Sequence, residues 1–416
     1  MTLAQGEAPQ PSPWLSVWLS PRNTIERIVA NSPRRHVLLL AAFGTTTTVL
    51  GQLVDKGATV ELLDWRIIAI VALFGAIIGI TQLYIFGFLF SWCGRILGGR
   101  ASAVDVRAAF AWGVVPSVAG LAICLTVLGW LSLSVGADVS RSAPQAAFIA
   151  LQGIVGATAI WSFIATLLMV GRVQSFGFWR TVLNFVLGYL AILLFALIIR
   201  TFFFQPFNMP AGSSKPTLLV GDHLFVSKFR YGYSKYSLPL SPPLFSGRIF
   251  GSEPQLGDLV VFRHPRDSST DYVKRIVGLP GDTVQMIGGA LHINGQAVKR
   301  ERIADFVENE QGTRPARVKQ WRETLSSGVS YATLDLVENG FHDNTPVYQV
   351  PAGHYFMMGD NRDNSTDSRV RPEVGGVGYV PFENLVGRVE IIFLSINQDN
   401  PDQPAVRFDR IGTIVR

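Results

Sequence analysis

Hydrophobic and polar residues follow one pattern in the first 200 residues of the chain and a different pattern in the rest. In the first part, five long apolar stretches contain no Asp, Glu, Lys or Arg; they span residues 37–54, 67–91, 108–135, 146–170 and 182–199. A helix of about 20 apolar residues is long enough to cross the hydrocarbon core of a bilayer. The pattern therefore predicts a membrane protein whose N-terminal domain, residues 1–200, is a bundle of five transmembrane helices.

The second part has short runs of alternating apolar and polar residues, separated by Gly, Pro and Asp. Runs rich in Val, Ile, Phe and Tyr predict strands at residues 258–262, 272–277, 283–286, 291–293 and 386–396. We therefore expect a mostly β domain over residues 203–416. Within this domain, residues 300–345 are more charged and less periodic, which predicts an insertion with weak internal structure.

Composition and charge narrow the classes of protein. The chain has 416 residues, of which 48% are hydrophobic and 16% charged, so disordered and fibrous proteins are excluded. The net charge is +6, but the chain has no Lys/Arg-rich run, and nucleic acid is not expected as a partner. Positive residues gather before the first stretch and after the second and fourth, which predicts by the positive-inside rule that the N-terminus is cytoplasmic and the β domain extracytoplasmic.

Three segments of the second part carry candidate chemistry. Residues 207–218 place Ser213 and Ser214 between Pro and Gly residues, where a serine is usually only a turn residue. Lys274 lies inside an apolar strand pattern, where most lysines occupy a solvated edge. Residues 359–369 are dense in turn formers and opposite charges, a composition also typical of a salt-bridged surface loop.

Together, a serine and a lysine can perform acyl transfer if the lysine is neutral. Its pKa must then fall from about 10.4 toward 7–8, and burial among apolar neighbours such as Val273 and Ile276 would lower it. No metal or cofactor is required. The histidines show no HExxH spacing and the chain has no GxxxxGK[ST] loop, so zinc and nucleotide sites are not expected. Spacing alone leaves open a Ser-His-Asp triad with His223 or His264.

The second part resembles the type I signal peptidases, membrane-bound serine proteases with a Ser/Lys dyad. The similar segments, in the order and spacing of that family, are PAGSSKPTLLVGDHLFVSKFRYG, GDLVVFRHP, DYVKRIVGLPGD, MGDNRDNSTDSR and VPFENLVGRVEIIFLS. The resemblance implies that Ser213 is the nucleophile, Lys274 the general base and Ser365 the hydroxyl that orients the lysine. It further implies two charge pairs that support the site and a set of residues that line the substrate pockets; these are Asp360 with Arg275, Asp367 with Arg369, and Phe207, Met209, Tyr272 and Val273.

Two positions depart from the family pattern. Ser214 stands where the family usually has Met, so two adjacent hydroxyls compete for the role of nucleophile; the register with Gly212 and Pro216 favours Ser213. Ala211 stands where the family often has a serine that donates a hydrogen bond to the oxyanion. Losing one such donor lowers kcat by about 10²–10³-fold.

The resemblance implies an enzyme of the bacterial inner membrane that removes signal peptides from exported preproteins by cleaving after small residues, in the pattern Ala-x-Ala. Its expected partners are preprotein signal peptides and the lipid bilayer, with the secretion machinery as a further candidate. The first part resembles the Yip-type membrane family in its number of spans and in the opening WLSVWLSPRNTIERIVANSPRRHVLLLAAF. Two alternatives remain open: a membrane scaffold whose peptidase domain has lost activity, and a peptidase that serves a dedicated set of substrates.

Overall fold

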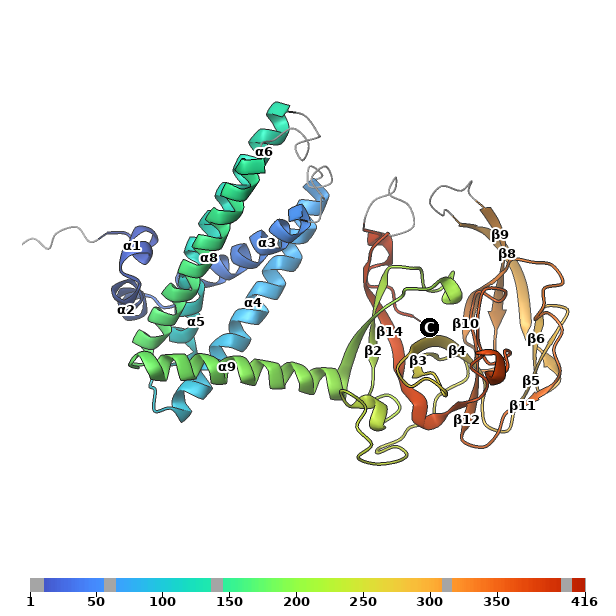
Figure 1. Cartoon of the computed structure of the whole chain (residues 1–416). Helices are drawn as coiled ribbons and strands as arrows, with labels where there is room; N and C mark the ends of the chain where they lie inside the picture. Colours follow the sequence, from blue (N-terminus) through green and yellow to red (C-terminus); the bar gives the residue numbers. More distant parts are fainter. Residues whose placement is uncertain (1–10, 56–64, 136–144, 309–315, 398–405, 416) are drawn as a thin grey trace, which may run out of the picture. The chain divides into compact units, whose positions relative to one another are not determined.

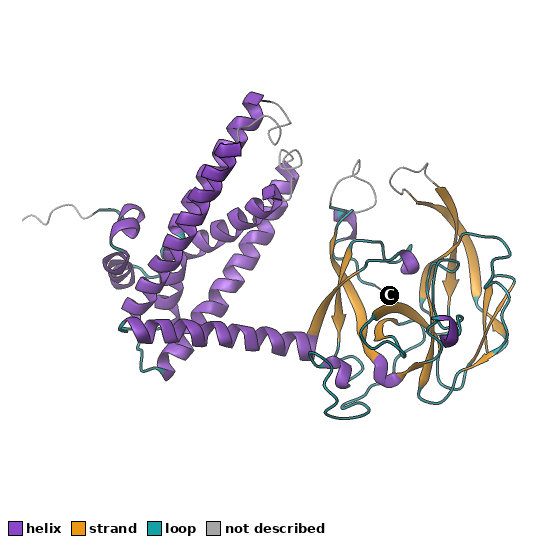
Figure 2. Cartoon of the chain, viewed as in Figure 1, coloured by secondary structure: helices purple, strands orange, loops and turns teal. Residues whose placement is uncertain are grey.

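The computed structural model describes residues 11–55, 65–135, 145–308, 316–397 and 406–415 (Figure 1). The chain divides into two compact units, Met1–Phe195 and Ala196–Arg416. Figure 2 shows that helices make up the first unit, whereas strands dominate the second. Helices followed by a sheet-rich C-terminal part confirm the predicted fold class.

The N-terminal unit consists of short helices and of long apolar helices. The described helices are α1 (Pro13–Leu19), α2 (Pro21–Asn31), α3 (Val37–Asp55), α4 (Trp65–Ile96), α5 (Ala103–Gly113), α6 (Val115–Val135), α8 (Gln145–Val173) and α9 (Phe178–Ile198). Within the described residues, four stretches are long and apolar enough to cross a membrane: Ile68–Ile96, Ala103–Val127, Ile149–Val173 and Phe178–Phe203. The first predicted span, residues 37–54, coincides with α3, whose described apolar part is shorter, Val37–Leu50.

The third predicted span is interrupted in the structure. Helix α5 ends at Gly113, and α6 begins at Val115 with Pro116 as its second residue. Proline has no amide hydrogen and cannot continue the hydrogen-bond ladder of a preceding helix, which explains the break. The helical stretch also begins earlier than predicted, because Ser102 and Asp105 form a capping box at the start of α5.

Close packing holds the helices of the N-terminal unit together. Helices α2, α5 and α6 each pack against α8. A side chain at Gly113 would overlap Thr166 of α8, so the glycine permits a close helix approach. Phe90 contacts Phe110 and Phe185 edge to face, with ring centroids 4.8 and 5.3 Å apart.

The C-terminal unit contains a seven-stranded sheet in the order β1-β2-β14-β3-β4-β12-β13. Its strands are β1 (Phe204–Asn208), β2 (Asp222–Ser227), β3 (Leu259–Arg263), β4 (Asp271–Gly278), β12 (His354–Met358), β13 (Val380–Pro381) and β14 (Leu385–Ser395). A four-stranded sheet joins β5 (Thr283–Ile287), β6 (Ala290–Ile293), β7 (Gln296–Ala297) and β11 (Tyr348–Gln349). All five predicted strands are confirmed, as β3, β4, β5, β6 and β14.

The prediction of weak internal structure for residues 300–345 is wrong. This segment contains most of a three-stranded antiparallel sheet, made of β8 (Lys299–Glu308), β9 (Ala316–Thr324) and β10 (Ser330–Asp335). The periodic signal is weak because most of β8 is exposed on both faces. Charged side chains nevertheless find partners within the sheet: Arg300 pairs with Asp335 at 2.9 Å, and its guanidinium lies 3.9 Å from the Trp321 ring.

Candidate active site

Ser213 lies in the connection between β1 and β2, where Gly212–Ser214 form a single 3₁₀ turn. Backbone contacts fix this turn to the segment that follows β12. The amide of Asn361 donates to the Ser213 carbonyl at 3.1 Å, and its side-chain nitrogen donates to the Gly212 carbonyl at 3.2 Å. Two segments about 150 residues apart in sequence are therefore held together around one serine.

Lys274 projects from β4 to this serine. Its Nζ donates to Ser213 Oγ at 2.5 Å, and its side chain is almost completely buried. Burial lowers the pKa of Lys274 to about 8, while the carboxylates of Asp367 and Asp360 act in the opposite direction. An amine with this pKa is neutral in about one molecule in ten at pH 7, so it can accept a proton from a hydroxyl.

Ser214 makes a different contact. Its hydroxyl is fully buried and donates to the backbone carbonyl of Val273 at 3.2 Å. The two adjacent serines therefore differ in their surroundings: the hydroxyl of Ser213 contacts the lysine amine, whereas that of Ser214 joins the turn to β4.

Ser365 lies next to the turn but is not bonded to the lysine. Its side chain packs against Gly359, where a Cβ would overlap both Ser365 and the carbonyl of Ser213. Within the described residues, its buried hydroxyl has no hydrogen-bond partner. The expected hydrogen bond from Ser365 to Lys274 is not formed in this structure, although the hydroxyl is available for it.

Asp360 and Arg275 form a buried ion pair beside the turn. Arg275 donates from Nε and from a terminal nitrogen to the two carboxylate oxygens at 2.9 and 2.8 Å. Thr217 also donates to Asp360, at 2.6 Å. The carboxylate of Asp360 therefore joins β4, the residues just after the serine turn and the segment after β12.

Asp367 and Arg369 form the second buried pair. Arg369 contacts both carboxylate oxygens, at 2.9 and 2.8 Å, and the amide of Gly359 donates to Asp367 at 3.0 Å. Burial by itself would raise the pKa of Asp367, but the charge and hydrogen bonds of Arg369 hold this pKa at about 2. Asp367 is therefore ionised at every pH at which the enzyme is expected to work.

A third buried pair was missed by the sequence analysis. Arg362 contacts Glu323 of β9 through two hydrogen bonds of 3.0 and 2.6 Å, and Tyr331 of β10 donates to the same carboxylate at 3.0 Å. The guanidinium of Arg275 lies 4.0 Å from the centre of the Tyr331 ring. The three-stranded sheet thus contacts and supports the segment around residues 359–369.

Glu308 was also missed. It lies at the end of β8 and accepts a hydrogen bond of 2.7 Å from Lys215, two residues after Ser213. Neither Glu308 nor Glu323 belongs to a recognisable motif, and both lie in the segment that was expected to be weakly structured. No signal in the sequence pairs them with residues so far away.

The expected substrate-pocket residues lie around β1 and β4. Met209 is buried in a hydrophobic cluster against which Phe207 and Val273 pack. Tyr272 is on the same face of β4 as the lysine, with its ring centre 5.6 Å from Lys274 Nζ. Residues 271–275 pair with β3, but β12 pairs only with residues 275–278, so the first half of β4 has one edge without a strand partner among the described residues.

The pKa of Lys274 leads to a prediction for pH dependence. A lysine accepts a proton only when it is deprotonated, so kcat/KM should rise about tenfold per pH unit below pH 8 and level off above it. Initial rates between pH 6 and 9 measure this profile, with circular dichroism to confirm that the fold persists.

Lys228 provides the matched control for this profile. It is a second buried lysine whose pKa burial lowers to about 8, and it donates to the Ser237 carbonyl at 2.8 Å. Lys228→Met should keep the midpoint of the profile. A rate that is flat from pH 6 to 9, or a midpoint that moves in Lys228→Met, would contradict the assignment to Lys274.

Comparisons with known proteins agree with both resemblances found in the sequence. A family model described as signal peptidase, peptidase S26, matches residues 182–394, and a Yip1 domain model matches residues 15–200. Signal peptidase I of Rickettsia typhi is 43% identical over 208 residues, which cover 48% of this chain and 75% of that protein. Signal peptidase I of Rickettsia massiliae is 41% identical over 216 residues, covering 50% and 78%.

A solved structure also matches in sequence. The crystal structure of a signal peptidase I from Enterococcus faecalis is 25% identical and covers 33% of this chain and 97% of that chain, with a TM-score of 0.19.

Proposed function

The chain belongs to the signal peptidase I family, and from that premise we propose that Ser213 and Lys274 form the catalytic dyad of a membrane-bound peptidase that removes signal peptides from preproteins. One observation carries the proposal: a buried lysine amine whose pKa is about 8 lies 2.5 Å from a serine hydroxyl. No third titratable group is needed, because the amine itself serves as acid and base.

The reaction is acyl transfer in two steps. Lys274 takes the proton of Ser213 as Oγ attacks the scissile carbonyl, and then returns it to the leaving amine. Water hydrolyses the resulting ester with the same lysine as base. With Ala211 in place of a hydroxyl donor, the backbone amide of Ser213 donates to the oxyanion. The Ser365 hydroxyl, which has no partner among the described residues, is available to orient the lysine when substrate binds.

The charged residues around the dyad position it. Asp360 and Arg275 hold the segment just after the serine turn through Thr217, while Asp367 and Arg369 hold the segment that carries Ser365. These pairs keep the reacting groups in place without touching the substrate.

The substrate binds as an extended strand along the open half of β4, and its small side chains enter pockets lined by Phe207, Met209, Tyr272 and Val273. The enzyme acts at the inner membrane of a bacterium, with residues 203–416 as the extracytoplasmic catalytic domain. Residues 1–200 form the membrane domain with its N-terminus in the cytoplasm, and the secretion machinery supplies the preproteins.

Substrate specificity provides the test of this function. A preprotein that ends its signal in Ala-x-Ala should be cut after the last Ala by the detergent-purified chain. Replacing that Ala by Leu should lower kcat/KM about 100-fold, because extra methylenes packed against the buried Met209 cost about 1–3 kcal/mol.

Mass spectrometry of the products gives the cut site, and Leu at the middle position of Ala-x-Ala is the matched control, which should be cut normally. Equal cleavage of all three preproteins would contradict the pocket assignment. A well-folded chain that cuts none of them would support the inactive scaffold instead.

A further inference from the structure

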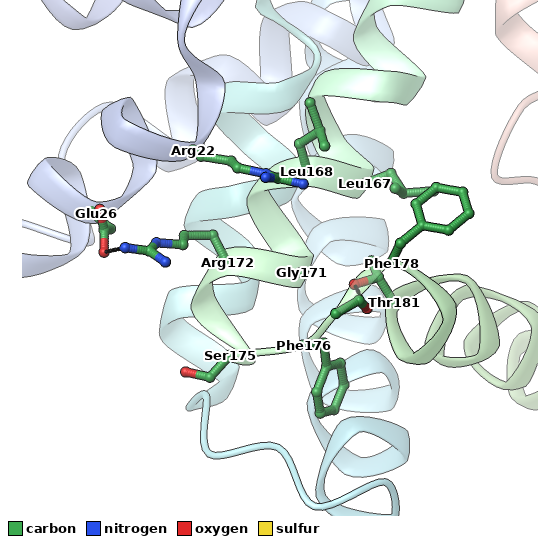
Figure 3. Close-up of a pocket in the computed structure, with 11 residues that line it drawn as sticks. Arg22, Glu26, Leu167, Leu168, Gly171, Arg172, Ser175, Phe176, Phe178 and Thr181 are labelled. Carbon is green, nitrogen blue, oxygen red and sulfur yellow. Dashed lines mark hydrogen bonds and ion pairs between the residues drawn. The ribbon is translucent and has the colours of Figure 1, made fainter.

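The N-terminal unit contains a cavity of about 640 Å³, located where α2 meets the turn between α8 and α9 (Figure 3). It lies wholly within the part that the Yip1 domain model matches. None of the residues that line it belongs to the proposed peptidase site. The cavity therefore needs an explanation of its own.

The ends of two membrane spans place this cavity at the surface of the bilayer. The span in α8 ends at Val173, and the span in α9 begins at Phe178. The turn between them, residues 174–177, must lie where the helices leave the hydrocarbon core. The cavity therefore faces the layer that phospholipid headgroups occupy.

Two arginines supply positive charge to the cavity. In Figure 3, the side chain of Arg22 extends from α2 toward Leu168 of α8, and it has no hydrogen bond or ion pair with any described residue. Arg172 pairs with Glu26 at 2.5 Å, but both side chains are about half exposed. An exposed ion pair of this kind contributes little free energy to stability. Arg172 can therefore exchange the Glu26 carboxylate for a more highly charged anion.

Part of the lining of the cavity is apolar. Leu167, Leu168 and Phe178 line it, and the Phe178 side chain is exposed. The apolar surface continues along α8, where Ile160 and Phe163 are also exposed. Guanidinium groups in the cavity, next to apolar residues that extend along α8, match a molecule with an anionic head and a hydrocarbon tail.

We propose that this cavity binds an anionic phospholipid, with the headgroup phosphate held by Arg22 and Arg172 and an acyl chain along α8. Arginine binds phosphate through paired hydrogen bonds, and an anionic headgroup neutralises charge that zwitterionic lipid leaves uncompensated. The bound lipid joins α2 to the α8–α9 turn.

The test measures lipid retention, which is independent of peptidase activity. The full chain is reconstituted in nanodiscs of phosphatidylcholine with 20% phosphatidylglycerol, extracted in mild detergent, and its bound lipids are counted by native mass spectrometry. The wild type should retain phosphatidylglycerol above its share of the bilayer. Arg22→Gln and Arg172→Gln should each lower this enrichment about fivefold.

Two further variants separate binding from a structural effect. Arg95→Gln, at the end of α4 and outside the cavity lining, is the matched control and should retain lipid like the wild type. Glu26→Gln frees Arg172 from its carboxylate and should increase retention, which loss of structure would not do.

Three results would overturn the proposal. These are a wild type without preference for phosphatidylglycerol, equal retention by Arg22→Gln and Arg95→Gln, and full displacement of the lipid by 5 mM inorganic phosphate, which would indicate a site for small anions. Each of them leaves the proposed peptidase function untouched.

Discussion

Ser213→Ala is expected to lower kcat/KM for preprotein cleavage by about 10⁴-fold or more, whereas Ser214→Ala should remain active. The reason is geometric, since the Ser213 hydroxyl lies 2.5 Å from the lysine amine and the Ser214 hydroxyl bonds to a backbone carbonyl. Ser214→Ala removes that buried hydrogen bond and lowers stability by about 1 kcal/mol, but it removes no catalytic group.

Lys274→Met should cause a loss as large as that of Ser213→Ala. The two residues act together in the same proton transfer, so the double variant should be no slower than either single variant. Initial rates with an Ala-x-Ala preprotein, together with mass spectrometry of the products, provide the measurement. An active Ser213→Ala beside an inactive Ser214→Ala would show that the nucleophile is the second serine.

The parts of the fold that could be predicted from sequence are those with a periodic apolar signal. Strand β4 was predictable because Val273, Ile276 and Val277 stand in a run of apolar residues bounded by turn signals. The same run did not predict that Lys274 is buried, since most lysines in such a pattern occupy a solvated edge. The resemblance implied its role, and the structure shows that its side chain is buried. The membrane helices were predictable for a similar reason, since a bilayer requires long uncharged stretches.

What could not be predicted depends on contacts between segments distant in sequence. Lys215 contacts Glu308 across the interval from the serine turn to β8, and no local pattern indicates such a pair. Strand β8 was missed because its residues are mostly exposed on both faces, which removes the alternation that marks a half-buried strand. The Ser365 hydroxyl illustrates a further limit: similarity suggests its partner, but only the local packing decides whether the bond forms.

The buried pair of Glu323 and Arg362 yields the second large prediction. Both side chains are at most 6% exposed, so Glu323→Ala leaves an uncompensated guanidinium in the interior. Breaking a buried pair in this way should destabilise the C-terminal unit by about 3–5 kcal/mol. Because Arg362 also donates to the Gly359 carbonyl at 3.2 Å, the segment that carries Ser365 should shift and kcat should fall more than KM rises.

Urea unfolding of the full chain in detergent, followed by tryptophan fluorescence, measures the change. The matched control is Glu338→Ala, which removes the exposed carboxylate that pairs with Lys319 of β9 and should leave the transition unchanged. The double variant Glu323→Leu with Arg362→Met removes both charges and should recover most of the stability, since neither charge is then left without a partner. Recovery of stability without recovery of kcat would show that Arg362 positions the catalytic segment as well as filling the core, whereas equal unfolding of Glu323→Ala and Glu338→Ala would mean that the three-stranded sheet does not support the site.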